Sequence, residues 1–345
     1  MTGDAGLFAL MRTGVGIVVL AGLLGFVPAV GDPLDPLSFD DSPRERHIIH
    51  PDWFETSFLD LGEDLAEAVK TGKIGLMVYF GQENCAYCEA LMEINFKTLD
   101  IVRYTREHFN VVALDIWGSQ PVTTVEGSTS TEREFAVAQQ TNFTPSIIFY
   151  DETGKQAFKM TGYYPPYKFR AALEYVADEH YQRESFAEYL ERADPPPKFV
   201  EQGLNEQDFF QPPPYALDRS RFAAEHPMVV FFEQTQCHAC DILHTEPLVH
   251  AQAADLLHLV DAVQLDMWAD TPVITPRGKK TTAREWARSL GIFYAPTLVF
   301  FNERGKEIIR IDSVVRLYRL SRVIEYVVAR GYETGINYQE WHGLR

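Results

Sequence analysis

The 345-residue sequence contains few cysteines and few basic residues. Its four cysteines are too few for a small secreted protein held together by many disulfides. Lys and Arg number 31 against 49 Asp and Glu, so the formal net charge is −18. Because nucleic acids and anionic membranes are bound through clustered basic side chains, we expect neither as a partner. The 46% of hydrophobic residues over this length predicts globular domains, two rather than one.

All four cysteines lie in two C-x-x-C pairs, Cys85/Cys88 and Cys237/Cys240. A disulfide across so short a loop stabilises a fold little, so these pairs are not structural crosslinks. Two such pairs can bind zinc together, but they then usually lie about 15–20 residues apart, and here a whole domain separates them. Each pair also opens a helical pattern, and a helix amino terminus favours the thiolate. We therefore expect two redox centres and no metal site.

An apolar run, residues 14–30, follows Arg12 near the amino terminus and ends with small residues at Val27 and Ala29. This is the pattern of a cleaved secretory signal. We expect residues 1–31 to be such a signal, or alternatively an uncleaved membrane anchor, because the run is close to the minimum length of a spanning helix. Either way the protein is expected to be exported to the periplasm.

The chain contains an internal repeat of domain size. Residues 114–155 align with residues 265–306, and the shared positions include Asp115/Asp266, Trp117/Trp268, Pro145/Pro296 and Gly154/Gly305. Two proline runs lie between the copies and are typical of a stiff, extended spacer. We therefore predict a first domain at residues 48–193, a proline-rich linker at 194–214 and a second domain at 215–345.

Both copies show the same order of elements. An apolar strand leads to C-x-x-C and a helix, and a second strand, another helix and a hairpin follow. The predicted strands before the cysteines are residues 74–80 and 228–233. This order predicts the α/β class, with one mixed sheet flanked by helices in each domain.

A strand, C-x-x-C at a helix start, and a later Thr-Pro or Ala-Pro that opens the next strand resemble the thioredoxin superfamily. The resemblance implies that Pro145 and Pro296 are cis, and that Thr144 and Ala295 place backbone groups beside the sulfurs to bind substrate. The first copy also resembles SoxW, the periplasmic thioredoxin of the sulfur-oxidation system, in the segments "CAYC", "PVTTVEG", "FTPSIIFYDETGK" and "GYYPPYKF".

The resemblance also implies the chemistry. Cys85 and Cys237 would attack a substrate disulfide, and Cys88 and Cys240 would then release the reduced substrate. No cofactor is expected besides the redox-active disulfides. Disulfide-containing proteins or small molecules would be substrates, and a membrane thiol carrier of the CcdA or DsbD type would be the electron donor. A disulfide isomerase or chaperone of the same fold, and a non-enzymatic metal-binding scaffold, are the alternatives.

Two further residues beside the cysteines are predicted to contact substrate. Tyr87 precedes the second cysteine as it does in some disulfide isomerases and glutaredoxins, which leaves the redox direction open. His238 follows Cys237, where an imidazolium would favour the thiolate.

The proton acceptor that is usual in thioredoxins is missing from both copies. Tyr79 and Phe231 stand where that family has a buried Asp. Glu83 or Glu233 would accept the proton through water, or would simply be solvated loop carboxylates.

The copies differ more around the cysteines than in them. The first has Thr144 and residues 162–164, which resemble a substrate-facing rim, whereas the second has Ala295 and residues 312–313. We therefore expect Cys85 to dominate the turnover of protein disulfides.

The targeting hypothesis makes a direct prediction. Protein purified from an exporting bacterial host should begin near Val30 or Asp32, because the signal is cleaved after its small residues. Intact-mass spectrometry of the soluble and membrane fractions checks this. Recovery of residues 14–29 in the membrane fraction would establish the anchor instead.

Overall fold

A computed structural model describes residues 35–193 and 203–344 of the chain. The predicted signal, residues 1–31, and residues 194–202 of the predicted linker lie outside these ranges. Asp32–Arg345 form one compact unit, and both repeats belong to it. Within the described ranges, no helix is long and apolar enough to cross a membrane.

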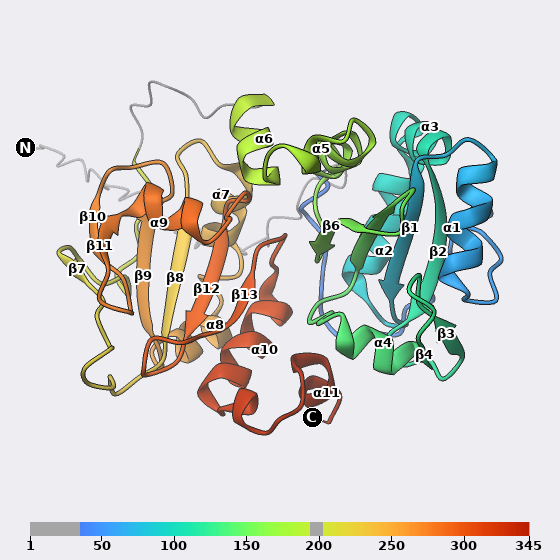
Figure 1. Cartoon of the computed structure of the whole chain (residues 1–345). Coiled ribbons are helices and arrows are strands. Elements are labelled where there is room, and N and C mark those ends of the chain that lie inside the picture. The colour runs from blue at the N-terminus through green and yellow to red at the C-terminus, as the bar shows by residue number, and fades with distance from the viewer. Residues whose placement is uncertain (1–34, 194–202, 345) are drawn as a thin grey trace, which may run out of the picture. The chain divides into compact units, whose positions relative to one another are not determined.

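The first domain has a four-stranded mixed sheet in the order β2-β1-β5-β6 (Figure 1). Strand β1 pairs in parallel with β2 and antiparallel with β5, and β5 pairs antiparallel with β6. The elements are α1 (Leu61–Lys70), β1 (Gly75–Gly81), α2 (Ala86–Glu93), α3 (Leu99–His108), β2 (Phe109–Asp115), β3 (Pro121–Thr123), β4 (Thr129–Thr131), α4 (Glu132–Ala138), β5 (Ser146–Asp151), β6 (Gln156–Thr161), α5 (Pro166–Ala177) and α6 (Phe186–Ala193).

The second domain repeats this topology with a sheet in the order β9-β8-β12-β13. Its elements are β7 (Tyr215–Ala216), β8 (Met228–Glu233), α7 (His238–Thr245), α8 (Ala251–Leu257), β9 (Asp261–Asp266), β10 (Pro272–Ile274), β11 (Lys280–Thr282), α9 (Ala283–Ser289), β12 (Thr297–Phe301), β13 (Glu307–Ile311), α10 (Leu317–Val328) and α11 (Tyr338–Gly343). Short 3₁₀ turns are Asn95–Lys97, His180–Gln182 and Gly331–Glu333. The predicted α/β class, with one mixed sheet per domain, is confirmed.

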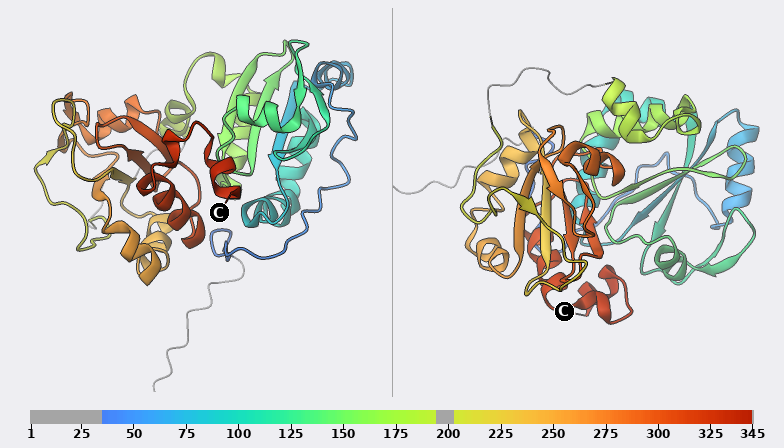
Figure 2. Two further views of the ribbon diagram at one scale, coloured as in Figure 1. Left: turned by 90° about the horizontal axis from the view of Figure 1, so that it is seen from below. Right: turned by 60° about the vertical axis from the view of Figure 1, so that its left-hand side comes forward.

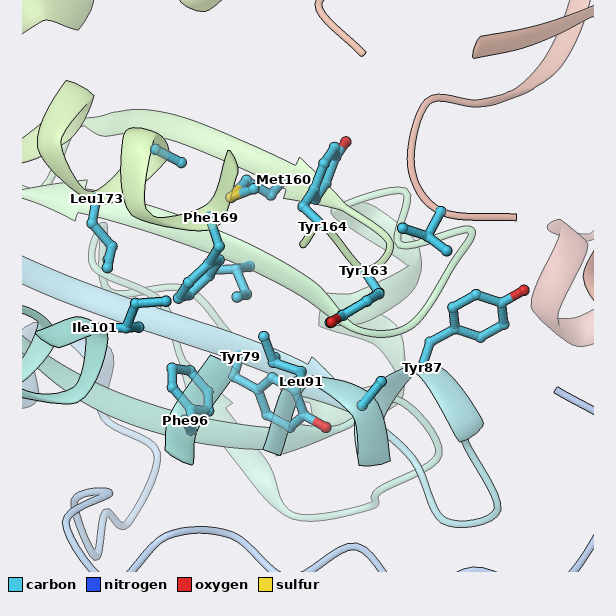
Figure 3. Close-up of a cluster of buried hydrophobic side chains, with 14 of the residues drawn as sticks. Tyr79, Tyr87, Leu91, Phe96, Ile101, Met160, Tyr163, Tyr164, Phe169 and Leu173 are labelled. Carbon is cyan, nitrogen blue, oxygen red and sulfur yellow. The ribbon is translucent and has the colours of Figure 1, made fainter. Parts of the chain in front are cut away.

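The central strands are apolar on both sides because helices cover both faces of each sheet (Figure 2). In β1, Met77 and Tyr79 face one cluster, whereas Leu76, Val78 and Phe80 face another. This alternation follows from the two-residue period of a strand. Figure 3 shows the first cluster, in which Tyr79 lies among side chains from the covering helices.

Side-chain caps fix the starts of the helices in the repeat. Thr131 accepts a hydrogen bond from Glu134 N, and the Glu134 carboxylate accepts one from Thr131 N, which is a capping box at the start of α4. Thr282 caps α9 in the same way through Glu285 N. These caps mark the start of the helix that the order of elements predicts between the second strand and the hairpin of each copy.

The two domains contact each other through equivalent segments. Val314 N donates a hydrogen bond to Tyr163 O at 3.0 Å, and Tyr163 and Tyr164 are buried. The prediction that residues 162–164 form a substrate-facing rim is wrong, because this loop packs against the second domain.

A segment before the first domain takes part in this contact. Residues 35–46, which we call the N-terminal strap, bring Leu37 into the cluster that also contains Tyr163, Ile242 and Val314. Apolar side chains of both domains and of the strap therefore share one core.

Gly162 should be the most size-sensitive glycine of this contact. A Cβ there would lie 2.0 Å from Ser313 Oγ and 2.6 Å from Ser313 Cβ, whereas nothing lies within 4 Å of a Cβ on Gly127. Both glycines have positive φ, +95° and +85°. Gly162→Ala should therefore lower the free energy of unfolding by about 1–3 kcal/mol more than Gly127→Ala, in urea denaturation. Equal losses would show that backbone strain alone matters.

Candidate active sites

Each C-x-x-C pair forms a disulfide at the amino terminus of a helix. Cys85 is the N-cap of α2, and its Sγ accepts a hydrogen bond from Cys88 N at 3.0 Å. Cys237 is the N-cap of α7, and its Sγ accepts one from Cys240 N at 3.1 Å. An N–H directed at the sulfur and the positive end of the helix dipole both stabilise a thiolate after reduction.

The two pairs occupy separate places. Cys85 lines one pocket and Cys237 lines another. In residues 35–193 and 203–344, no three His, Cys, Asp or Glu side chains are grouped so that they could hold a metal ion. In the described part of the chain the four sulfurs thus form two separate disulfides.

The residues before the two prolines lie against the outer cysteines. The Thr144–Pro145 and Ala295–Pro296 peptide bonds are both cis, as the resemblance implied. Thr144 Oγ1 lies 3.3 Å from Cys85 Sγ, and Ala295 O lies 3.5 Å from Cys237 Sγ. The structure thus brings these predicted site residues to the sulfurs, and their binding of substrate stays a prediction.

A chain of hydrogen bonds orients the Thr144 hydroxyl. Trp117 Nε1 donates to Gln82 Oε1 at 2.6 Å, and Gln82 Nε2 donates to Thr144 Oγ1 at 2.8 Å. Because Thr144 Oγ1 already accepts this bond, its own hydrogen is available for Cys85 Sγ.

The second site keeps the tryptophan and the amide but lacks the hydroxyl. Trp268 Nε1 donates to Gln234 Oε1 at 2.9 Å, and Ala295 stands in place of Thr144. The Cys85 thiolate therefore has a hydroxyl donor that the Cys237 thiolate does not have.

The position of the missing proton acceptor is filled differently in the two domains. In the first, Tyr79 is buried and its hydroxyl lies only 2.1 Å from where a Cβ on Gly81 would be. Burial raises the pKa of Tyr79, so its hydroxyl stays protonated. In the second domain the corresponding Phe231 is buried and has no ionisable group.

Glu83 and Glu233, the two carboxylates considered in place of the missing proton acceptor, differ in their exposure to solvent. The Glu83 side chain is 55% exposed, as expected of a loop carboxylate. Glu233 is fully buried, with His244 Nε2 at 2.9 Å and Gln264 Nε2 donating to it at 3.0 Å. The interpretation of Glu233 as a solvated carboxylate is therefore wrong.

Tyr87 and His238 both contact the N-terminal strap. Tyr87 is buried, donates its hydroxyl hydrogen to Asp41 Oδ2 at 2.8 Å and accepts from Arg316 N at 2.9 Å. Burial, with the Asp41 charge next in importance, raises the pKa of Tyr87. The exposed His238 has its Nε2 2.7 Å from Asp35 Oδ2. The sequence predicted substrate contacts for both and gave no sign of the strap.

Each outer cysteine lies in a pocket that the other domain helps to enclose. The Cys85 pocket has a volume of about 640 Å³, and its second-domain walls are Tyr318, Arg319, Tyr338, Gln339, His342 and Gly343. The Cys237 pocket has a volume of about 350 Å³, and α5 and α6 contribute Tyr167, Lys168, Glu188 and Glu191. Each of the two cysteines is only 7% exposed.

The Cys85 pocket contains a histidine that is uncharged at neutral pH. Burial, together with the positive charges of Arg322 and Arg319, lowers the pKa of His342 to about 4. The pocket therefore presents a neutral imidazole beside the aromatic rings of Tyr318 and Tyr338.

Comparison with known proteins agrees with this geometry. Residues 61–177 and 216–328 each match the thioredoxin-like domain family. The chain belongs to this family. Both matched ranges fall inside the two domains predicted from the repeat, so we call these the first and second thioredoxin-like domains.

Solved structures similar to the chain have thioredoxin folds. A thioredoxin-fold protein from Helicobacter pylori is 27% identical over 35% of this chain and 80% of its own, with a TM-score of 0.30. A thioredoxin from Thermus thermophilus is 25% identical over 34% and 83%, with a TM-score of 0.27. Thioredoxin O2 from Arabidopsis thaliana is 19% identical over 33% and 93%, with a TM-score of 0.24. No curated protein matches the chain.

Several residues of these thioredoxin-like sites were not predicted from the sequence. Gln82 and Gln234 could have been predicted, because they occupy equivalent positions in the two copies. The tryptophans that donate hydrogen bonds to them are equivalent as well. Asp41 and Arg319 could not have been predicted, because no sequence pattern connects the strap or α10 with the cysteines of the first domain.

The Thr144 hydroxyl makes a testable contribution to the Cys85 thiolate. Replacing Thr144 by Val removes the donor and should raise the pKa of the Cys85 thiol by about one pH unit, the size expected of one hydrogen bond to a charged group. The measurement is the pH dependence of iodoacetamide alkylation of the reduced protein, in a Cys237→Ser, Cys240→Ser background.

Thr144→Ser is the matched control for this experiment. Serine keeps the hydroxyl, so the pKa of Cys85 should stay near that of the parent protein. An unchanged pKa in Thr144→Val would mean that the hydroxyl does not donate to the sulfur.

Proposed function

We propose that this protein is an exported thiol–disulfide oxidoreductase that reduces disulfides at two C-x-x-C centres. The observation that carries the proposal is the position of Cys85 and Cys237 at helix N-caps, each sulfur accepting a backbone N–H. This environment favours a thiolate nucleophile once the disulfide is reduced.

The proposed reaction runs through a mixed disulfide. The Cys85 or Cys237 thiolate attacks one substrate sulfur, and the other substrate sulfur leaves and takes up a proton. The Cys88 or Cys240 thiolate then attacks the mixed disulfide and releases the second substrate thiol. Two electrons pass from the protein dithiol to the substrate, and the protein ends with one disulfide.

The proposed location and electron donor rest on sequence patterns. Residues 1–31 have the pattern of a secretory signal, which supports a periplasmic protein. The resemblance of the first domain to SoxW supports a membrane thiol carrier of the CcdA or DsbD type as donor.

The shape of the sites favours a reductase over an isomerase or chaperone. A protein that holds unfolded chains needs an open apolar surface at its cysteines. Here both outer cysteines are nearly buried and line pockets of about 640 and 350 Å³, which are in the range of small-molecule sites.

The function predicts a simple result with a small disulfide. Reduced protein, freed of reductant, should convert bis(2-hydroxyethyl) disulfide to thiol with concurrent loss of four protein thiols, two at each centre. Thiol trapping followed by mass spectrometry measures both. The Cys85→Ser, Cys237→Ser double variant should show no such loss, because both nucleophiles are gone.

A single-domain thioredoxin is the positive control. If it is oxidised by the reagent while the folded wild-type protein keeps all four thiols, this protein is not a disulfide reductase. If the double variant is oxidised as fast as the wild type, the assignment of the nucleophiles is wrong.

A further inference from the structure

An arginine of the second domain occupies a backbone acceptor beside the Cys85 sulfur. Arg319 Nη2 donates a hydrogen bond of 2.8 Å to the carbonyl oxygen of Thr144. The hydroxyl of the same Thr144 lies 3.3 Å from Cys85 Sγ. The Thr144 carbonyl beside Cys85 thus already accepts a hydrogen bond from within the protein.

Arg319 is held firmly in this place. Its guanidinium carbon lies 3.3 Å from the centre of the Tyr87 ring and 5.0 Å from that of Phe143. Its backbone N donates to Asp41 Oδ2 at 2.8 Å, and the residue is only 8% exposed. Two aromatic rings and a carbonyl therefore contact the guanidinium, and the Asp41 carboxylate fixes the backbone that carries it, so Arg319 is not a mobile surface group.

This contact is unfavourable for an extended polypeptide at the site. A peptide that brings its disulfide to Cys85 Sγ lies alongside Thr144 and must pair its own backbone N–H groups there. Arg319 already occupies one of the two lone pairs of the Thr144 carbonyl. A peptide N–H must therefore approach beside the guanidinium, whose positive charge repels the N–H hydrogen, or displace Arg319, and a guanidinium left unpaired in a buried pocket is costly. A small disulfide has no backbone to pair and needs only space, which the pocket of about 640 Å³ offers.

We propose that Arg319 is a specificity-determining residue that closes the Cys85 centre to extended polypeptides and reserves it for low-molecular-weight disulfides. This proposal replaces the expectation from the sequence that Cys85 dominates the turnover of protein disulfides. The inference rests on the proposed reductase function. The reaction at this centre takes one small disulfide to two small thiols, while the Cys85/Cys88 dithiol becomes a disulfide.

The second domain offers an internal comparison. In the alignment of the two copies, Lys168 corresponds to Arg319, because each is the third residue of its helix, α5 or α10. Lys168 lines the Cys237 pocket. Lysine is a compact charge on a flexible stem and lacks the planar guanidinium that stacks on Tyr87. The restriction by a stacked arginine is therefore a property of the Cys85 centre.

The test uses the full chain with Cys237→Ser and Cys240→Ser, so that only the Cys85 centre reacts. Its rate constants with bis(2-hydroxyethyl) disulfide and with insulin are compared before and after Arg319→Met. Methionine keeps an apolar stem against Tyr87 but cannot donate a hydrogen bond. The insulin-to-small-disulfide ratio of kcat/KM should rise about 3- to 10-fold, the value of one hydrogen bond.

Two further variants separate this role from a general effect of charge or stability. Arg319→Lys keeps a donor within reach of Thr144 O and should leave the ratio closer to that of the parent. Arg330→Met removes a surface arginine that pairs with Glu303, and should leave the ratio unchanged. Circular dichroism and urea unfolding establish that each variant is folded.

The outcomes distinguish this inference from the proposed function. A parent that reduces insulin as readily as the small disulfide, or an unchanged ratio in folded Arg319→Met, overturns the role of Arg319 and leaves the reductase intact. A parent that reduces neither substrate overturns the function of the Cys85 centre and the inference with it. If Arg319→Met unfolds, the Arg319→Lys variant decides. A ratio near that of the parent supports the proposal, and a rise of about 3- to 10-fold in the ratio contradicts it, because lysine keeps a hydrogen-bond donor.

Discussion

The carboxylate of Asp41 connects three parts of this protein. It is buried and accepts hydrogen bonds from the Tyr87 hydroxyl of α2 and from the backbone N–H groups of Tyr318 and Arg319 in α10. A buried charge is tolerated only when such donors replace its water. The strap, the helix that carries Cys85 and the closing helix of the other domain therefore depend on one another, and the position of the Arg319 side chain follows from them.

Around this constraint, two copies of one fold give their sulfurs different surroundings. Thr144 in one domain corresponds to Ala295 in the other, and Gly81 corresponds to Glu233. In the first domain the Tyr79 hydroxyl fills the space beside Gly81. In the second domain the corresponding Glu233 has a buried carboxylate that contacts His244. The reactive pairs themselves keep the same helix-cap geometry. The duplication thus preserved the nucleophiles, while their hydrogen-bond donors and nearby ionisable groups diverged.

What the sequence could predict was local. The strand before Cys237 and the helix between the second strand and the hairpin of each copy follow from neighbouring residues, and both agree with the structure. The cis state of Pro145 and Pro296 was implied by the family resemblance and also agrees. The loop at residues 162–164 was misassigned because its aromatic residues suit an exposed rim and a buried interface equally well. The contact of Arg319 with Thr144 joins positions that are far apart in the sequence and carry no shared pattern. Burial of Glu233 likewise depends on His244, whose spacing from it signals nothing.

Because α10 lines the pocket of Cys85 and α5 lines that of Cys237, each domain carries in its own sequence part of the pocket beside the other's cysteines. Replacing either half by an unrelated thioredoxin would remove side chains that line the cysteine pocket of the other half. An alignment of one half with a single-domain relative therefore omits the pocket residues that the other half contributes. A substitution in one half of the chain can thus change the surroundings of the cysteines in the other half.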